Sequence, residues 1–106
     1  GRLQVAMTQL AAAARLSPRD ARYRAQYGRA LAAGKQTRRL AESELQAAVK
    51  LEPSNPRYRT MLAELYFDLN FHRRAQTELQ RALALDPNHE KARALLRKIE
   101  KARRKS

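Results

Sequence analysis

The stretch PRYRTMLAELYFDLNFHRRAQTELQRALALDPNH, residues 56–89, decides the fold of this chain. It holds two runs in which apolar side chains recur every three or four residues, as Leu62 and Leu65 do. This spacing places the side chains on one face of an α-helix. Asn70 separates the two runs, and Pro87 ends the second because the residue before a proline avoids the helical region. The stretch therefore predicts two helices joined by a short turn.

The same pattern recurs along the chain at spacings of 35 and then 34 residues. Five columns align: Ala6, Ala41 and Ala75; Leu10, Leu45 and Leu79; Ala13, Ala48 and Ala82; Leu16, Leu51 and Leu85; Pro18, Pro53 and Pro87. A fixed period of this length is typical of a repeat architecture. No stretch alternates with period two, so strands are not expected. We expect six helices, at residues 2–16, 20–33, 38–51, 56–69, 72–85 and 89–104.

The ends of these helices carry signals of their own. Three helices are preceded by residues whose side chains can cap a helix: Asp20, Thr37 and Asn55. Pro56 suits the first turn of its helix. Gly34 and Asn70 mark the turns between paired helices. The local signals therefore agree with the boundaries that the repeat predicts.

A helix-turn-helix unit of about 34 residues with this pattern resembles the tetratricopeptide repeat, TPR, whose motif is W-x2-L-G-x2-Y, then A-x3-F, A and P. The unit at 56–89 matches with Leu62, Ala63, Tyr66, Ala75, Leu79, Ala82 and Pro87. The unit at 21–55 matches less fully, with Tyr27, Gly28, Leu31, Ala41, Leu45, Ala48 and Pro53. Both depart from the motif at the Trp position, which holds Arg24 and Arg59. The resemblance implies an all-α fold, a right-handed superhelix of antiparallel helix hairpins.

The resemblance also divides the chain. We expect a single TPR domain over 1–106: the second helix of a truncated repeat at 1–18, two repeats at 19–53 and 54–87, and a basic capping helix at 88–106. The chain starts Gly-Arg-Leu-Gln, without an initiator methionine, so we expect it to be a piece of a longer protein.

Packing expectations follow from the register. The small residues Gly28 and Ala63 should lie where the two helices of a repeat approach closely, with Ala41 and Ala75 facing them. The first helix lacks its partner helix, so part of its apolar surface should be exposed and open to self-association. The side chains concerned are Leu3, Val5, Met7 and Leu10.

The composition narrows the function classes. The 106 residues are 43% hydrophobic with only 3 Gly and 4 Pro, which fits one helical domain. Cysteine is absent, which excludes a disulfide framework and a thiolate metal site and fits a cytoplasmic location. No apolar run approaches the roughly 20 residues that a transmembrane helix needs.

The chain carries no recognisable catalytic motif. His72 and His89 fall in turns at opposite ends of the helices, so they cannot share a metal ion. No phosphate-binding loop, metalloprotease motif or nucleophile elbow is present. The tyrosines recur with the repeat and are therefore expected to be packing residues: Tyr23, Tyr27, Tyr58 and Tyr66. We expect no enzyme activity, no cofactor and no metal.

The net charge of +13 favours anionic partners. TPR proteins bind partners in a concave groove lined by the first helix of each repeat, so the resemblance implies a set of candidate peptide-binding residues: Arg22, Arg29, Arg57, Thr60, Glu64, Phe67, Lys91, Lys98 and Lys101. Six of the nine are cationic, which suits an acidic peptide. The carboxylate clamp known in the family is not reproduced, because only Lys91 matches its five positions.

We therefore predict a non-catalytic protein–protein interaction scaffold, of the kind found in co-chaperones and assembly factors, that binds a protein or an acidic peptide in this groove. The alternative is binding of a polyanion, either nucleic acid or an anionic membrane, through the basic C-terminal helix. Residues 91–106 hold eight basic side chains and one acidic one. Those on or near one face are Arg97, Lys101, Arg104 and Lys105.

Overall fold

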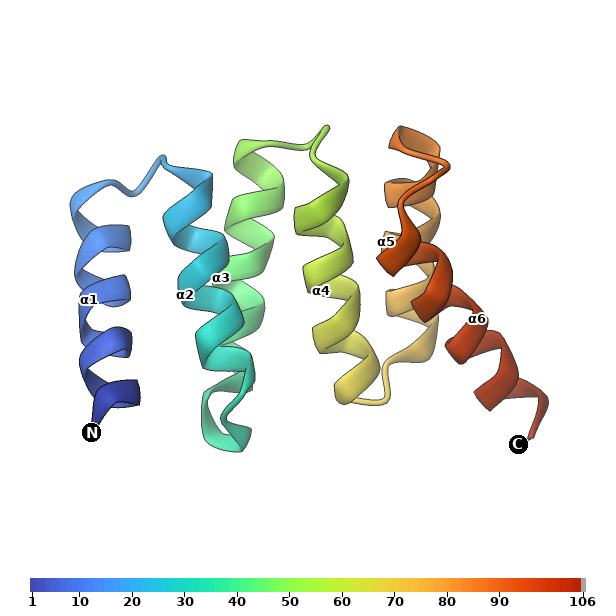
Figure 1. Cartoon of the computed structure of the whole chain (residues 1–106), viewed down its shortest axis with the longest axis horizontal. Helices are drawn as coiled ribbons and strands as arrows, with labels where there is room; N and C mark the ends of the chain where they lie inside the picture. The colour runs from blue at the N-terminus through green and yellow to red at the C-terminus, as the bar shows by residue number, and fades with distance from the viewer. Residues whose placement is uncertain (106) are drawn as a thin grey trace. The chain divides into compact units, whose positions relative to one another are not determined.

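The computed structural model describes residues 1–105, and every described element is helical (Figure 1). The elements are α1 (Arg2–Leu16), α2 (Ala21–Ala32), η1 (Lys35–Thr37), α3 (Arg38–Leu51), α4 (Pro56–Asp68), α5 (His72–Leu85) and α6 (Glu90–Arg104). The six α-helices confirm the sequence prediction to within one residue at each end. The short 3-10 helix η1 occupies the turn in which the first repeat is one residue longer than the second.

The chain forms two compact units, Gly1–Pro53 and Ser54–Ser106. In the first, α2 packs against α1 and, more extensively, against α3. In the second, α4 and α5 form an antiparallel hairpin, and α6 contacts both of them. Each unit therefore contains one complete helix hairpin and one additional helix.

Two of the three predicted caps are confirmed. Oδ1 of Asp20 and Oδ1 of Asn55 each accept a hydrogen bond of 3.0 Å from the backbone N–H two residues on. The prediction for Thr37 is wrong, because its side chain makes no capping bond to α3. The Thr37 hydroxyl instead donates to the carbonyl oxygen of Leu31, near the end of α2, where backbone carbonyls have no helical partner.

The prolines end the helices as predicted. Ser17, Glu52 and Asp86 precede the three repeated prolines and have φ angles of −129°, −133° and −144°. The chain therefore leaves the helical region at the same point of each repeat. Asn70, between α4 and α5, has a φ of 63°, the left-handed conformation that a tight turn after a helix favours.

The repeated alanines and leucines build the core of each hairpin. The following side chains are at most 1% exposed: Ala41, Leu45, Ala48, Ala75, Leu79 and Ala82. A Cβ atom on Gly28 would lie 2.8 Å from Cγ of Leu45, so α2 and α3 approach as closely as predicted. The atoms nearest to that point belong to Leu45 and Glu44 rather than to the predicted Ala41. Close approach therefore depends on Gly28.

The aromatic side chains and the first helix also follow the packing expectations. Tyr58 and Tyr66 are 7% and 6% exposed, which confirms that they are packing residues. Leu3 and Val5 of α1 are 69% and 57% exposed, as expected for a helix covered on one side only. Met7, further along the same helix, is half-buried, as is Leu10.

Candidate peptide-binding surface

The α4–α6 surface is formed within the second unit by six of the predicted binding residues: Arg57, Glu64, Phe67, Lys91, Lys98 and Lys101. Helical spacing places the first three on one stripe of α4 and the last three on one stripe of α6. The two helices contact one another. The five charged residues of this surface are exposed, and Phe67 is half-buried.

The two stripes meet at Phe67. The Nζ atom of Lys98 lies 5.3 Å from the centre of the Phe67 ring, within the range of a cation–π interaction. Phe67 also stacks on the His72 ring, with the ring centres 5.3 Å apart and an interplanar angle of 17°. The structure thus brings Phe67, His72 and Lys98 together, an apolar contact area with a cation above it.

The charge on this surface is strongly one-sided. Arg57, Lys91, Lys98 and Lys101 supply four cations, and Glu64 supplies the single carboxylate. Exposed like charges near one another repel, so the surface favours an anionic partner over a cationic one.

Thr60 does not belong to this surface, and its prediction as a binding residue is wrong. Its side chain is 1% exposed, and its hydroxyl donates a 2.8 Å hydrogen bond to the carbonyl oxygen of Pro56 one turn earlier. A β-branched hydroxyl in a helix commonly bonds in this way. Thr60 is therefore a packing residue of α4.

The two remaining predicted residues, Arg22 and Arg29, lie on α2 in the first unit and are exposed. Arg22 is tied to the start of its own helix, because its Nη2 atom lies 2.9 Å from Oδ2 of Asp20. The hydrogen bond from the Arg22 side chain is the main reason that the pKa of Asp20 lies below its ordinary value. Arg22 thus serves the cap of α2 as well as the surface.

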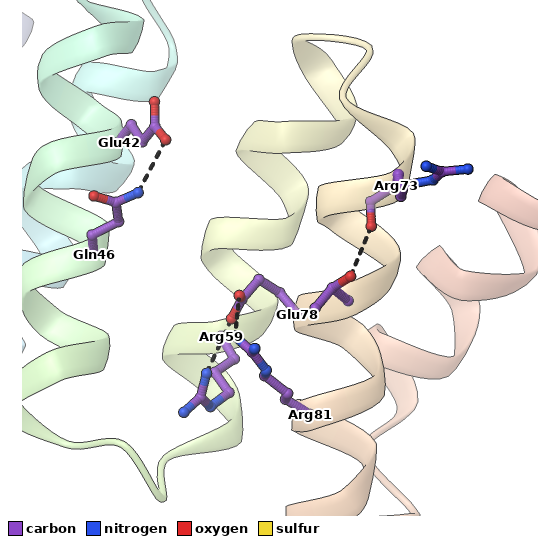
Figure 2. A network of polar contacts seen from close by, with 7 residues as sticks. Glu42, Gln46, Arg59, Arg73, Glu78 and Arg81 are labelled. Carbon is purple, nitrogen blue, oxygen red and sulfur yellow. Dashed lines mark hydrogen bonds and ion pairs between the residues drawn. The ribbon is translucent and has the colours of Figure 1, made fainter.

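Each hairpin also contains an ion pair that was not predicted from the sequence. Nη1 of Arg24 lies 3.0 Å from both carboxylate oxygens of Glu44, and Nη1 of Arg59 lies 3.1 Å from Oε1 of Glu78. Figure 2 shows Glu78 between Arg59 and Arg81, whose Nη1 atom is 3.1 Å from Oε2. All four paired residues of the two hairpins recur in register, the arginines 35 and the glutamates 34 residues apart. That spacing was the signal available in the sequence.

These arginines stand at the positions where the TPR motif has a tryptophan. The glutamates are buried, with side chains 10% and 12% exposed, so each pair replaces aromatic packing by a charged link between the two helices of a hairpin. Arg24 and Arg59 therefore each link the two helices of a hairpin.

Within residues 1–105, no three His, Asp or Glu side chains group in a way that could hold a metal ion. In the same part of the chain, no helix is both long and apolar enough to cross a membrane.

The model of the family described as "Tetratricopeptide repeat" matches residues 38–99, more than half of the chain. The chain belongs to the tetratricopeptide repeat family. A sequence search of curated proteins finds no match.

Solved TPR structures share the fold. The first TPR of Spaghetti (RPAP3), bound to the HSP90 peptide SRMEEVD, matches with a TM-score of 0.86 and 24% identity over 96% of this chain and 80% of its own. TTC0263, a thermophilic TPR protein of Thermus thermophilus, matches with a TM-score of 0.82 and 31% identity over 92% of this chain. This chain spans about half (49%) of the length of TTC0263.

A third structure of similar fold is the type III secretion translocator chaperone SycD of Yersinia enterocolitica. It matches with a TM-score of 0.85 and 19% identity over 98% of this chain and 76% of its own. At this identity the likeness shows a shared fold.

Proposed function

We propose that this TPR chain is a non-catalytic scaffold that binds an acidic segment of a partner protein, and that the α4–α6 surface makes the central contact. The observation that carries the proposal is the meeting of Phe67 and Lys98 in a surface with four cations and one carboxylate. An acidic side chain placed beside Lys98 gains a charged partner, and the Phe67 ring offers apolar area to the neighbouring residue.

Structures of similar fold support a peptide as the ligand. The TPR of Spaghetti is bound to a peptide, SRMEEVD, that contains three acidic residues. SycD has been solved with a peptide of the translocator YopD, and PcrH with the chaperone-binding region of PopD. A co-chaperone or assembly role in the cytoplasm remains our prediction.

The expected affinity is modest and depends on salt. Exposed ion pairs contribute roughly 0–1 kcal/mol each and an aromatic contact about 1 kcal/mol, so four cations and one ring supply at most about 5 kcal/mol, which corresponds to a dissociation constant of about 0.1–1 mM. Charges on an exposed surface are screened beyond about 10 Å at 0.1 M salt. Affinity should therefore fall markedly between low and high salt.

The test is fluorescence anisotropy with a labelled peptide rich in Asp and Glu, at two salt concentrations. The variant Arg57→Glu with Lys98→Glu should bind at least tenfold more weakly, while circular dichroism shows unchanged helicity. The matched control is Arg93→Glu with Arg97→Glu. Both control residues are exposed and line a different hollow of the second unit. Their substitution changes the net charge by the same amount. The control variant should lose much less affinity.

Two other results would count against the proposal. Equal losses in the two variants would show that only net charge matters, which favours the alternative of polyanion binding by α6. A random DNA duplex that binds more tightly than the peptide, and that loses binding when the chain is truncated after Glu100, would establish that alternative.

Self-association is a separate part of the proposal and depends on α1. Leu3 and Val5 are the most exposed large apolar side chains of that helix apart from Leu16, so a second copy can cover them. Sedimentation should show dimers at high concentration, and Leu3→Lys with Val5→Lys should return the chain to a monomer. A monomer at every concentration contradicts this part and leaves the peptide proposal intact.

A further inference from the structure

A second cationic feature lies within the second unit, away from the stripe that carries Arg57 and Lys91. It is a hollow of about 690 Å³, which we name the α5 hollow, between the α4–α5 turn, the first half of α5 and the last turn of α6. Its lining residues are Asn70, Phe71, His72, Arg73, Arg74, Thr77 and Arg103. The helices α5 and α6 contact one another, so the hollow is built on packed elements.

The lining concentrates positive charge. Arg73, Arg74 and Arg103 contribute three guanidinium groups, and none of these lining residues, all in the described part of the chain, is acidic. Figure 2 shows the Arg73 side chain extending from α5 toward the neighbouring helix. Three guanidinium groups around one hollow repel each other, and an anion between them removes that repulsion.

Two of these arginines are restricted by contacts within the second unit. Nη1 of Arg103 donates a 2.6 Å hydrogen bond to Oε1 of Gln76. The Arg74 guanidinium lies over the Phe71 ring, 5.1 Å from its centre. Because both contacts already restrict the side chains, an anion that binds them costs less side-chain freedom than it would on unrestrained arginines.

We propose that the α5 hollow binds the dianionic phosphate of a phosphomonoester. Guanidinium groups pair with phosphate oxygens in a two-pronged geometry, and a dianion matches three cations better than a carboxylate does. The amide of Asn70 and the hydroxyl of Thr77 are additional polar groups of the lining. The hydroxyl of Thr77 already donates to the carbonyl oxygen of Arg73, so it offers no proton to the dianion.

His72 joins this hollow to the α4–α6 surface, because it lines the hollow and stacks on Phe67. A phosphoserine in a partner segment that contacts Phe67 would therefore lie within reach of the arginines. The hollow does not depend on the peptide proposal, since it shares none of the cations of the α4–α6 surface.

The test is a ¹H–¹⁵N titration of the full chain, at constant ionic strength, with inorganic phosphate, with free phosphoserine and with acetate. Phosphate and phosphoserine should give saturable shifts at Arg73, Arg74, Thr77 and Arg103, and acetate should not. The variant Arg73→Gln with Arg74→Gln should weaken phosphate binding at least tenfold. Arg93→Gln with Arg97→Gln, equal in charge change, should leave it unchanged.

A further variant separates the two proposals. Arg57→Glu with Lys98→Glu should lose the acidic peptide and keep the phosphate. A serine peptide and its phosphoserine form then identify the source of the phosphate. If phosphorylation raises the affinity of the peptide tenfold or more, the phosphate belongs to a partner protein. If free phosphate binds as tightly as the phosphoserine peptide, the ligand is a small molecule. Unsaturable shifts spread over all basic residues, or unchanged binding by Arg73→Gln with Arg74→Gln, would overturn the inference.

Discussion

The two helix hairpins of this chain use the same ion pair in different ways. In the α2–α3 hairpin, a single nitrogen of Arg24 serves both oxygens of Glu44. In the α4–α5 hairpin, the oxygens of Glu78 are divided between Arg59 and Arg81. Position 47, which corresponds to Arg81 in the first hairpin, holds an alanine. Both repeats therefore contain one charged link, and the second hairpin adds another cation to it.

The hairpins also differ in the small residue at which their helices meet. In the first, Gly28 leaves no room for a Cβ atom beside Leu45. In the second, Ala63 occupies the corresponding position and is fully buried. The first hairpin therefore has a glycine packed against Leu45, and the second has an alanine at the corresponding position together with a larger ionic link.

The arginines of the hairpins are of two kinds, which differ in burial and pairing and therefore in their role in function. Arg24 and Arg59 are partly buried and paired, whereas Arg29 and Arg57 are exposed. Of these four, only Arg57 is proposed to meet a ligand. The net charge of +13 therefore overstates the charge that a partner encounters at any one surface.

The hairpins should differ most in how much stability each loses when its buried glutamate is substituted. Glu78→Ala should lower the free energy of unfolding by about 3 kcal/mol and Glu44→Ala by about 2 kcal/mol, because the first removes the carboxylate of two arginines and the second of one. Urea unfolding followed by circular dichroism measures both. Equal losses, or losses below about 0.5 kcal/mol, would contradict the structural role of the pairs.

Overpacking of the buried alanines should have the next largest effect. Ala41→Leu and Ala75→Leu insert a large side chain at positions with no exposed area, at a cost of about 1–3 kcal/mol. Ala84→Leu, on the exposed side of α5, is the control and should change thermal stability little. An unchanged melting temperature for Ala75→Leu would show that the register is wrong.

A smaller effect is expected where the helices cross. Gly28→Ala gains about 1 kcal/mol of helix propensity but places Cβ against Leu45, so the variant should be destabilised by about 1 kcal/mol net. Ala63→Gly should lose a similar amount for the opposite reason, lower helix propensity. Chemical unfolding distinguishes the two causes of destabilisation. In a chain that already carries Leu45→Ala, Gly28→Ala should cost less, because the side chain that the new Cβ atom meets is shorter. A stabilising Gly28→Ala on its own would mean that α2 and α3 are not in tight contact.

The smallest effect concerns the caps and their dependence on pH. Asp20 caps α2 and Asn55 caps α4, but only Asp20 titrates. The pKa of Asp20 is lowered in the fold, so its contribution is present above the ordinary pKa of 3.8 and is lost as the pH falls through the lower folded value. The protection of the amides near Arg22 against exchange, relative to their intrinsic rates, should fall below about pH 4, and Asp20→Asn should remove this dependence. An unchanged acid response in Asp20→Asn would exclude the cap as its source.

The helices, their ends and the core could be predicted from the sequence because each has a local signal. The spacing of apolar residues predicts the helices. A proline follows three of the helices, and the capping residues Asp20 and Asn55 stand directly before two of them. Helical periodicity also places the candidate binding residues of α4 and α6 on shared faces, where the charged ones are exposed. Their ligand is still a proposal.

The errors arose where a polar side chain had two possible partners. Thr37 was expected to cap a helix and Thr60 to line the surface, but both hydroxyls bond to nearby backbone carbonyls. The choice depends on the local backbone geometry, which composition and spacing do not specify. The partners of Arg24 and Arg59 lie about 20 residues away on a second helix, so the repeat spacing marks these residues but the packed hairpin is needed to pair them.

The most direct test of the central claim, that the repeated Arg–Glu pairs belong to the fold and not to a binding site, is a double-mutant cycle on Arg59 and Glu78. Urea unfolding of Arg59→Leu, Glu78→Leu and the double variant should give a coupling energy of about 1–3 kcal/mol, with the double variant more stable than Glu78→Leu. The double variant should also bind the acidic peptide as the parent chain does. A coupling energy near zero, together with lost peptide binding, would contradict the claim.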